Sequence, residues 1–156
     1  MCVYDDIRGW NTNPYLGSSE FYLEYGDFDV NISVPSNHFV VCSGELMNAS
    51  EVLTAEQQKR YKNASQSDET IIIRSKGEVE SAVNTSNKSN KTWHFKIKNS
   101  RDVSWASSAS YILDGARINL PSGKKSMAIS AYPIESDGNG AWGRSTEYIK
   151  GAVENY

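Results

Sequence analysis

Short segments in which apolar and polar residues alternate are the main feature of this sequence. The alternation has a period of two in residues 30–35, 93–98 and 127–131, which is typical of a strand with one buried side and one side facing solvent. Apolar or aromatic runs bounded by turn residues predict further strands at 20–25, 39–46, 70–74, 103–106 and 111–118. Many short strands with turn signals between them indicate a sandwich.

Two segments have the pattern of a helix. Thr54 and Gln57 match a capping box, which predicts a short surface helix over residues 55–63. After a loop signal at 137–140, the apolar period becomes that of a helix, at positions 148, 149, 152, 153 and 156. Residues 81–91 are poor in apolar side chains, and this predicts an exposed, mobile loop.

These elements predict a mostly β fold: an antiparallel β-sandwich with one short surface helix and a C-terminal helix. A chain of 156 residues fits a single domain with a core of its own. The apolar stripe of the last helix lacks a complete partner in the sequence, which suggests that the sequence is part of a longer protein.

Composition narrows the possible partners. The net charge of −3 is too small to indicate a nucleic-acid or anionic-membrane partner, and no basic cluster is interleaved with aromatic residues. No apolar run approaches the ~18 residues of a membrane helix. The sequence starts without a signal-peptide pattern, so we expect it to begin inside a longer protein.

Side chains that could hold a metal are sparse. The two histidines, His38 and His94, are far apart, and no His-x-x-x-His or Cys-x-x-Cys pair occurs. Because a catalytic zinc needs three protein ligands, we interpret both histidines as exposed structural residues. The acidic positions Asp5–Asp6, Asp27/Asp29 and 137–139 offer oxygen ligands for calcium, but we interpret them as solvated loops because an EF-hand register is missing.

The cysteines and tryptophans leave alternatives open. Cys42 lies in an apolar run and is interpreted as a free, buried cysteine, although a bridge to Cys2 is the alternative. Trp10, Trp105 and Trp142 are either core or interface residues, or exposed aromatic contacts of a binding module. No nucleophile elbow or phosphate loop is present. We therefore assign no catalytic, cofactor-binding or metal-ligating residue.

Longer segments carry a family resemblance, at residues 1–6, 9–10, 17–35, 39–46, 93–108 and 132–150. Together they resemble the N-terminal, non-catalytic domain of aminopeptidase-N-like zinc metallopeptidases, the gluzincin family. The similarity covers nearly the whole chain and is weakest over residues 84–90. It is a pattern of strands and aromatic residues, without a catalytic signature.

The resemblance implies that residues 1–141 form a saddle-like β-sandwich that packs on the catalytic domain of the same chain and roofs its active site. Residues 142–156 would then begin the first helix of that domain. Zinc and its general base are expected in the catalytic domain, the peptide substrate would be contacted only indirectly, and the parent protein would be exported, periplasmic or bound to the cell envelope. The alternatives are a stand-alone carbohydrate- or protein-binding sandwich and a purely structural domain.

One short motif could be mistaken for part of an active site. Residues 151–155 resemble the Gly-x-Met-Glu-Asn motif that binds the substrate amine in zinc aminopeptidases, with Val153 in place of Met. That motif belongs to an edge strand, whereas here the residues continue a helical stripe. We therefore expect a helix with no catalytic role, and no catalytic residue is carried over from the family.

Overall fold

The structure, a computed structural model, describes residues 3–12, 14, 17, 24–84, 89–138 and 140–155. The strands are β1 (Val3–Asp5), β2 (Gly9–Asn11), β3 (Gly26–Pro35), β4 (Phe39–Cys42), β5 (Glu45–Leu46), β6 (Ile71–Arg74), β7 (Asn90–Ser100), β8 (Trp105–Ser108), β9 (Tyr111–Asn119) and β10 (Lys125–Pro133). The helices are α1 (Ala49–Val52), α2 (Ala55–Ala64), α3 (Lys76–Val83) and α4 (Ser145–Asn155), with a 3-10 turn, η1 (Ile134–Ser136).

The first three-stranded sheet has the order β3-β7-β5, with antiparallel neighbours. Its register places Val30 opposite Phe95 and Ile32 opposite Trp93, so the apolar residues of the two long strands share one face. The alternate residues of β3 are exposed. The period of two in the sequence therefore predicts both the strands and their buried side.

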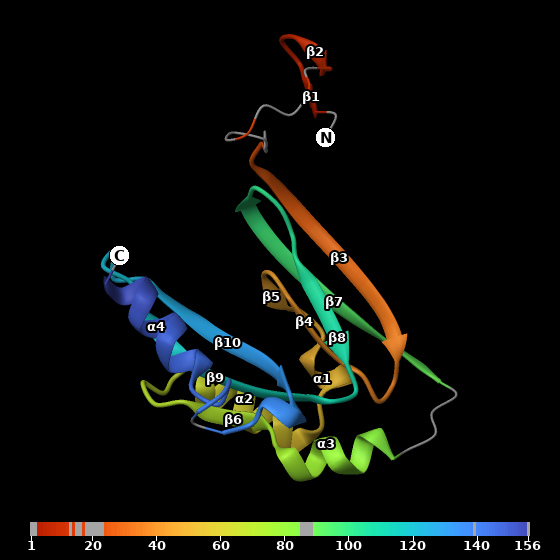
Figure 1. Cartoon of the computed structure of the whole chain (residues 1–156), viewed down its shortest axis with the longest axis vertical. Helices are drawn as coiled ribbons and strands as arrows, with labels where there is room; N and C mark the ends of the chain where they lie inside the picture. The colour runs from red at the N-terminus through yellow and green to blue at the C-terminus, as the bar shows by residue number, and fades with distance from the viewer. Residues whose placement is uncertain are drawn as a thin grey trace.

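The second three-stranded sheet has the order β10-β9-β6 and is also antiparallel. Helix α2 packs on β6, and α4 packs on β9 and β10. In Figure 1 the two sheets diverge from the bottom of the view, where α1, α2 and α3 lie, and α4 runs along β10. Two further strand pairs, β4 with β8 and β1 with β2, complete the sheets of the described residues.

The segment 39–46, predicted as one strand, forms two strands with different partners. Strand β4 pairs with β8, whereas β5 pairs with β7. Gly44, between them, has a φ of 95°, and a Cβ at this position would lie 2.4 Å from the carbonyl oxygen of Lys96. The chain can change partners here because glycine tolerates both this backbone conformation and this close approach.

The main core joins the two sheets. It consists of buried residues from β3, β4, β6, β7, β9 and the first two helices: Ile32, Val34, Phe39, Val40, Val52, Leu53, Ala64, Ile73, Trp93, Phe95 and Leu113. A smaller cluster connects α3 to the second sheet through Val79, Ile112 and Tyr132. Since burying such side chains is the main favourable term in folding, these contacts hold the sheets together.

The predicted fold class is confirmed in part. The chain is a strand-rich mixture of small antiparallel sheets and helices, and it includes the C-terminal helix. The expectation of only two helices is wrong, since α1 and α3 are also present. Helix α3 begins with a capping box, in which the side chains of Ser75 and Glu78 each bond to the backbone of the other. This signal is as explicit as the box formed by Thr54 and Gln57, which does begin α2 as predicted.

Other boundaries differ from the prediction. The loop expected at 81–91 is wrong at both ends, because α3 extends to Val83 and β7 begins at Asn90, while residues 85–88 lie outside the described residues. Most of the strand expected at 20–25 also lies outside them. The next strand, β3, begins at Gly26. Its pairing with β7 shifts register between Gly26 and Phe28.

Candidate functional site

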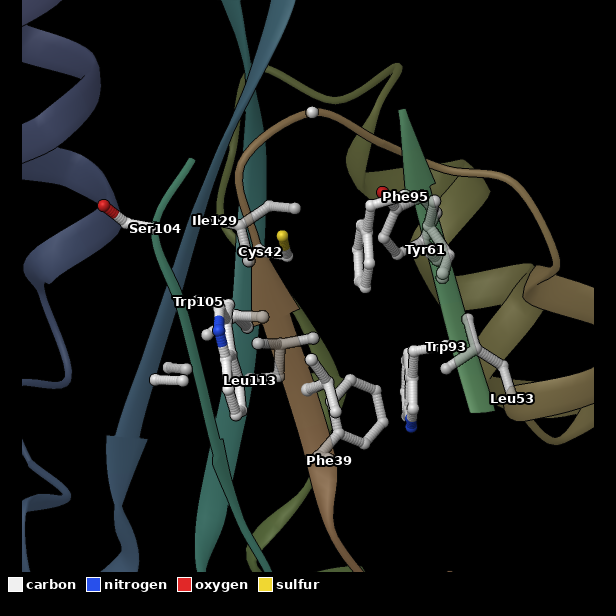
Figure 2. Close-up of a pocket in the computed structure, with 16 residues that line it drawn as sticks. Phe39, Cys42, Leu53, Tyr61, Trp93, Phe95, Ser104, Trp105, Leu113 and Ile129 are labelled. Carbon is white, nitrogen blue, oxygen red and sulfur yellow. The ribbon is translucent and has the colours of Figure 1, made fainter. Parts of the chain in front are cut away.

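An apolar pocket of about 340 Å³ lies between β4, β8, β7 and β9. Figure 2 shows Trp105, Leu113 and Cys42 on one side of it and Trp93 and Phe95 on the other. None of the described residues that line the pocket is charged. Its size and lining suit an apolar group of a ligand or partner.

The pocket is lined by apolar rings and has few groups that could take part in a reaction. Phe39, Trp93 and Phe95 form an aromatic wall, with ring centroids 4.8 Å and 6.4 Å apart for successive pairs. Cys42 is a free, half-buried thiol. Burial raises the pKa of this thiol, although the backbone of Ser43 opposes the effect. Because the thiolate is the reactive form, Cys42 is a weak nucleophile.

A second cavity, of about 650 Å³, shares Phe39 and Trp93 with the apolar pocket but is polar. It is bounded by the turn between β3 and β4, the start of α2, the start of α3 and the first half of β7. Its polar side chains are Ser36, Asn37, His38, Thr54, Gln57, Arg74, Ser75, Glu78, Ser81 and Lys91. The fold thus gathers polar residues from four separate segments in one place.

The carboxylate of the polar cavity is already neutralised within the protein. Arg60 donates from Nη1 and Nη2 to Glu78 at 2.9 Å and 2.7 Å. The backbone N–H of Ser75 and the Nε2 of Gln57 donate to the same carboxylate at 2.8 Å and 3.1 Å. Burial raises the pKa of Glu78, but these bonds outweigh burial and hold the pKa at about 2.

A buried polar cluster fixes α4 on the second sheet. Asp114 on β9 and Thr146 on α4 are both 0% exposed. Tyr132 Oη donates to Asp114 Oδ2 at 2.9 Å, Thr146 Oγ1 donates to Oδ1, and Thr146 Oγ1 lies 2.8 Å from Ser130 Oγ. Burial raises the pKa of Asp114, although the hydrogen bonds from Thr146 and Tyr132 act in the opposite direction.

Helix α4 turns its polar side toward its own sheet. Besides Thr146, Lys150 Nζ donates to the carbonyl of Asp68 at 2.7 Å, and Glu154 accepts the backbone N–H of Asn119 at 3.0 Å. These three helix residues are four positions apart and so lie on one face.

The apolar residues of α4 face solvent. Tyr148, Ile149 and Val153 are 61%, 39% and 41% exposed, and Trp142, just before the helix, is 61% exposed. A surface helix ordinarily places its apolar stripe on the core. The α4 apolar face, which we define as Tyr148, Ile149 and Val153, is therefore uncovered.

The two histidines lie apart, as the sequence predicts, but both are half-buried where exposed residues were expected. The Nδ1 of His38 is 3.4 Å from Ser107 Oγ. His94 is on the solvent-facing side of β7, where its Nε2 is 2.7 Å from Asp29 Oδ1, and Lys96 Nζ is 2.9 Å from Asp29 Oδ2. The hydrogen bonds from Lys96 and then from His94 lower the pKa of Asp29. This is a cross-strand ion pair on the surface of the sheet.

The acidic candidates do not converge. Asp6 and Asp137 are exposed, and Asp27 Oδ1 accepts a backbone hydrogen bond of 2.9 Å from Asn99 near the end of β7. The side chain of Asp5 lies outside the described ones. In the part of the chain that the structure describes, no group of three or more His, Cys, Asp and Glu residues could hold a metal ion. The alternative of a bridge from Cys2 falls on a residue outside that part.

The tryptophans considered as core residues are exposed. Trp10, Trp105 and Trp142 have exposed fractions of 67%, 55% and 61%, so they are not core residues, while the interpretation as interface residues stays a prediction. Trp105 borders the apolar pocket, and Trp10 packs edge-on against Tyr4 at 5.3 Å. The buried tryptophan is Trp93, at 0% exposure.

The motif at 151–155 lies inside α4, and its predicted helical conformation is confirmed. Glu154 bonds to the backbone of β9, and Asn155 Nδ2 donates to the carbonyl of Gly151 at 2.7 Å. Both side chains therefore have structural contacts within this domain.

Sequence reasoning missed the residues that give the two cavities their character and those of the buried polar cluster beneath α4, the polar seam, formed by Asp114, Ser130, Tyr132 and Thr146. Arg74 ends a run of isoleucines, and Asp114 interrupts the apolar run of β9. A charged residue inside an apolar strand was the available signal, because such a residue must find partners when it is buried. The position of Lys91 and Thr146 gave no such signal.

Comparisons with known proteins leave the family open. No protein-family model, curated protein or solved structure matches this chain. The described helices include none with the length and hydropathy needed to cross a membrane. The resemblance of the sequence segments to gluzincin N-terminal domains therefore stays a prediction.

Proposed function

We propose that this chain is a non-catalytic accessory domain of an aminopeptidase-N-like zinc metallopeptidase and that it packs on the catalytic domain through α4. The observation that carries the proposal is the orientation of this helix. Its polar side lies on its own sheet, while the α4 apolar face is directed to solvent.

Burial by a second protein surface would stabilise such a helix face. Fully burying an apolar side chain of this size contributes about 1.5–3 kcal/mol. The seam beneath α4 holds the helix in place through Asp114 and Thr146 without using its apolar residues. Residues 132–150 resemble the family's crossing into the catalytic domain, which makes that domain the proposed occupant.

The accessory role agrees with the chemistry of the described residues. Cys42 has a raised pKa, Glu78 is bound to Arg60, and Asp29 is bound to Lys96 and His94. Under the proposal, the two three-stranded sheets form the saddle-like sandwich, the zinc belongs to the catalytic domain, and the parent protein is exported. This domain would shape the peptide pocket and exclude water from it.

Metal analysis and activity assays on the purified chain test the proposal. We expect no stoichiometric zinc and no hydrolysis of aminoacyl substrates by the chain alone. The polypeptide to which it belongs is expected to contain a His-Glu-x-x-His helix in the domain that α4 contacts. Stoichiometric zinc together with chelator-sensitive turnover by this chain would overturn the proposal.

A stand-alone binding module is the second candidate, because Trp105 is exposed at the edge of an apolar pocket. Exposed aromatic side chains beside an apolar cavity are common contacts for sugars and peptides. A glycan or peptide array would support this function if one specific hit is lost in Trp105→Ala and kept in Trp142→Ala. An array without a specific hit would contradict it.

A further inference from the structure

Arg74, which lines the polar cavity, is a buried cation that forms no direct ion pair with a described carboxylate, although the charge of Glu78 acts on it through space. It is 3% exposed, and among the described residues no carboxylate lies within 4.0 Å of it. Its Nη1 and Nη2 donate to the backbone carbonyls of Tyr111 and Asn37 at 3.1 Å and 3.4 Å, and its guanidinium lies 5.4 Å from the centre of the Phe39 ring. Since a guanidinium has five N–H donors, donors remain for a ligand.

Lys91 is the second cation of this cavity. Its Nζ donates to the carbonyl of Val52 at 2.9 Å, and no ion pair joins it to a described carboxylate. Burial, followed by the nearby charge of Arg74, lowers the pKa of Lys91. Two like charges thus face one cavity in which the carboxylate of Glu78 is already bound to Arg60, so a further negative charge beside them is favourable.

Trp93 forms part of the cavity wall, but its indole N–H is closed off from the cavity space. The residue is 0% exposed and lines the cavity, and its Nε1 is the buried side-chain polar atom that lacks a hydrogen-bond partner among the described residues. Figure 2 shows this nitrogen at the end of the ring that points away from Phe95.

We propose that the polar cavity is a binding site for an oxyanion, a carboxylate or phosphate group, which Arg74 and Lys91 hold together. The acidic residue of the cavity, Glu78, does not compete, because both its oxygens are bound to Arg60. An oxyanion accepts several hydrogen bonds at once and neutralises positive charge, so one ligand group can bond to both Arg74 and Lys91.

The size of the cavity indicates a small organic anion. Its volume of about 650 Å³ exceeds that of an inorganic ion and lies in the range of small-molecule sites. Ser36 and Asn37 at its edge add neutral polar atoms for the rest of the ligand. This site is distinct from the α4 apolar face and does not depend on the proposed peptidase role.

The indole proton of Trp93 is a probe of the site. In nitrogen-15 correlation spectra, inorganic phosphate and succinate are titrated separately at constant ionic strength, with sodium chloride as the control. Because Trp93 forms part of the cavity wall, we expect a saturable shift of its Nε1–H signal, while the indole signals of the exposed Trp10, Trp105 and Trp142 stay in place. Trp93→Phe assigns the signal.

The two titrations separate the sources of the oxyanion. A shift with phosphate alone assigns the site to phosphate esters, and a shift with succinate alone assigns it to carboxylic acids. A Trp93 signal that neither anion moves, or that moves equally with chloride, overturns the proposal.

A matched pair of lysine variants tests the cavity itself. Lys91→Gln removes a charge from the cavity and is expected to weaken the affinity for the anion about tenfold, as for the loss of one charge-assisted hydrogen bond. Lys98→Gln makes the same change on the exposed side of the same strand and should leave the affinity unchanged. Equal affinities of the two variants would contradict the proposal even if both fold. Neither result bears on whether the chain binds zinc, so the two proposals fail separately.

Discussion

The packing around Trp93 and the packing beneath α4 bury side chains in opposite ways. Trp93 lies between Phe39 and Phe95, and its ring packs against both of these aromatic rings. Thr146 is equally buried, at 0% exposure, but its neighbours are the carboxylate of Asp114 and the hydroxyl of Ser130. The first region depends on close packing, and the second depends on a few correctly placed polar atoms.

The difference shows how one domain can hold a helix and still leave its apolar side free. Apolar packing beneath α4 would have required Tyr148, Ile149 or Val153 to face the sheet. The polar seam anchors the helix through Thr146, Lys150 and other polar residues instead. A hydrogen-bonded seam also specifies position closely, because each buried polar group needs its partner.

The largest expected loss of stability is in the apolar packing around Trp93. Trp93→Ala removes a fully buried ring and should lower the free energy of unfolding by about 3–5 kcal/mol, through lost transfer free energy and the cavity left behind. Urea unfolding followed by circular dichroism measures the change. Trp105→Ala, at a residue with 55% exposure, is the matched control and should cost less than ~1 kcal/mol. Similar losses in both would contradict the assigned core.

The next effect concerns the polar seam. Thr146→Val keeps the shape of the side chain but removes the hydroxyl, which leaves Asp114 without one of its donors. We expect the free energy of unfolding to fall by about 1–3 kcal/mol. Thr92→Val makes the same change in an exposed pair, where Thr92 Oγ1 is 2.7 Å from Ser33 Oγ, and should stay within about 0.5 kcal/mol of the original. Equal losses of stability in Thr146→Val and Thr92→Val would show that the buried hydroxyl of Thr146 does not stabilise the seam.

Acid pH should affect the buried carboxyl of Asp114 and the half-buried carboxyl of Glu78 in opposite directions. Asp114 has a raised pKa in the folded state, so its contribution is most favourable below its ordinary value of 3.8 and is lost as pH rises through the folded pKa. Glu78 has a pKa of about 2 against an ordinary 4.5, so its contribution is present above 4.5 and is lost as pH falls toward 2.

Unfolding free energies measured as a function of pH isolate these terms. The free energy of unfolding of the original chain minus that of Asp114→Asn should fall with rising pH. The corresponding difference for Glu78→Gln should rise. Two differences with the same slope would show that burial does not dominate at Asp114.

The smallest effect on stability is expected at the α4 apolar face. Ile149→Ser and Val153→Ser should change the free energy of unfolding by no more than about 0.5 kcal/mol, because both side chains already contact solvent. Val79→Ser, at a residue with 0% exposure, is the control and should destabilise the chain clearly. In the parent protein the two α4 variants should instead weaken the contact with the neighbouring domain. Their strong destabilisation of this chain alone would show that the face is already covered.

Local patterns predicted most elements but not their partners. The alternation around Trp93 and the capping box at Thr54 give β7 and α2 correctly, because both depend on residues close in the sequence. The change of partner at Gly44 was not predictable, since it depends on the carbonyl of Lys96 on another strand. The polar cavity was missed for the same reason: Arg74 and Lys91 belong to different strands, and only the sheet packing brings them to one space.

The sequence by itself determined the strand-rich character, the C-terminal helix and the shortage of metal ligands, because periodicity and residue type act locally. Only the tertiary structure decided which side of α4 is buried. Helical spacing identifies an apolar stripe, but it cannot show that Asp114 lies beneath the helix and accepts a hydrogen bond from the hydroxyl of Thr146. A buried carboxylate gains more from Thr146 than from an apolar neighbour, and that contact turns the apolar stripe outward.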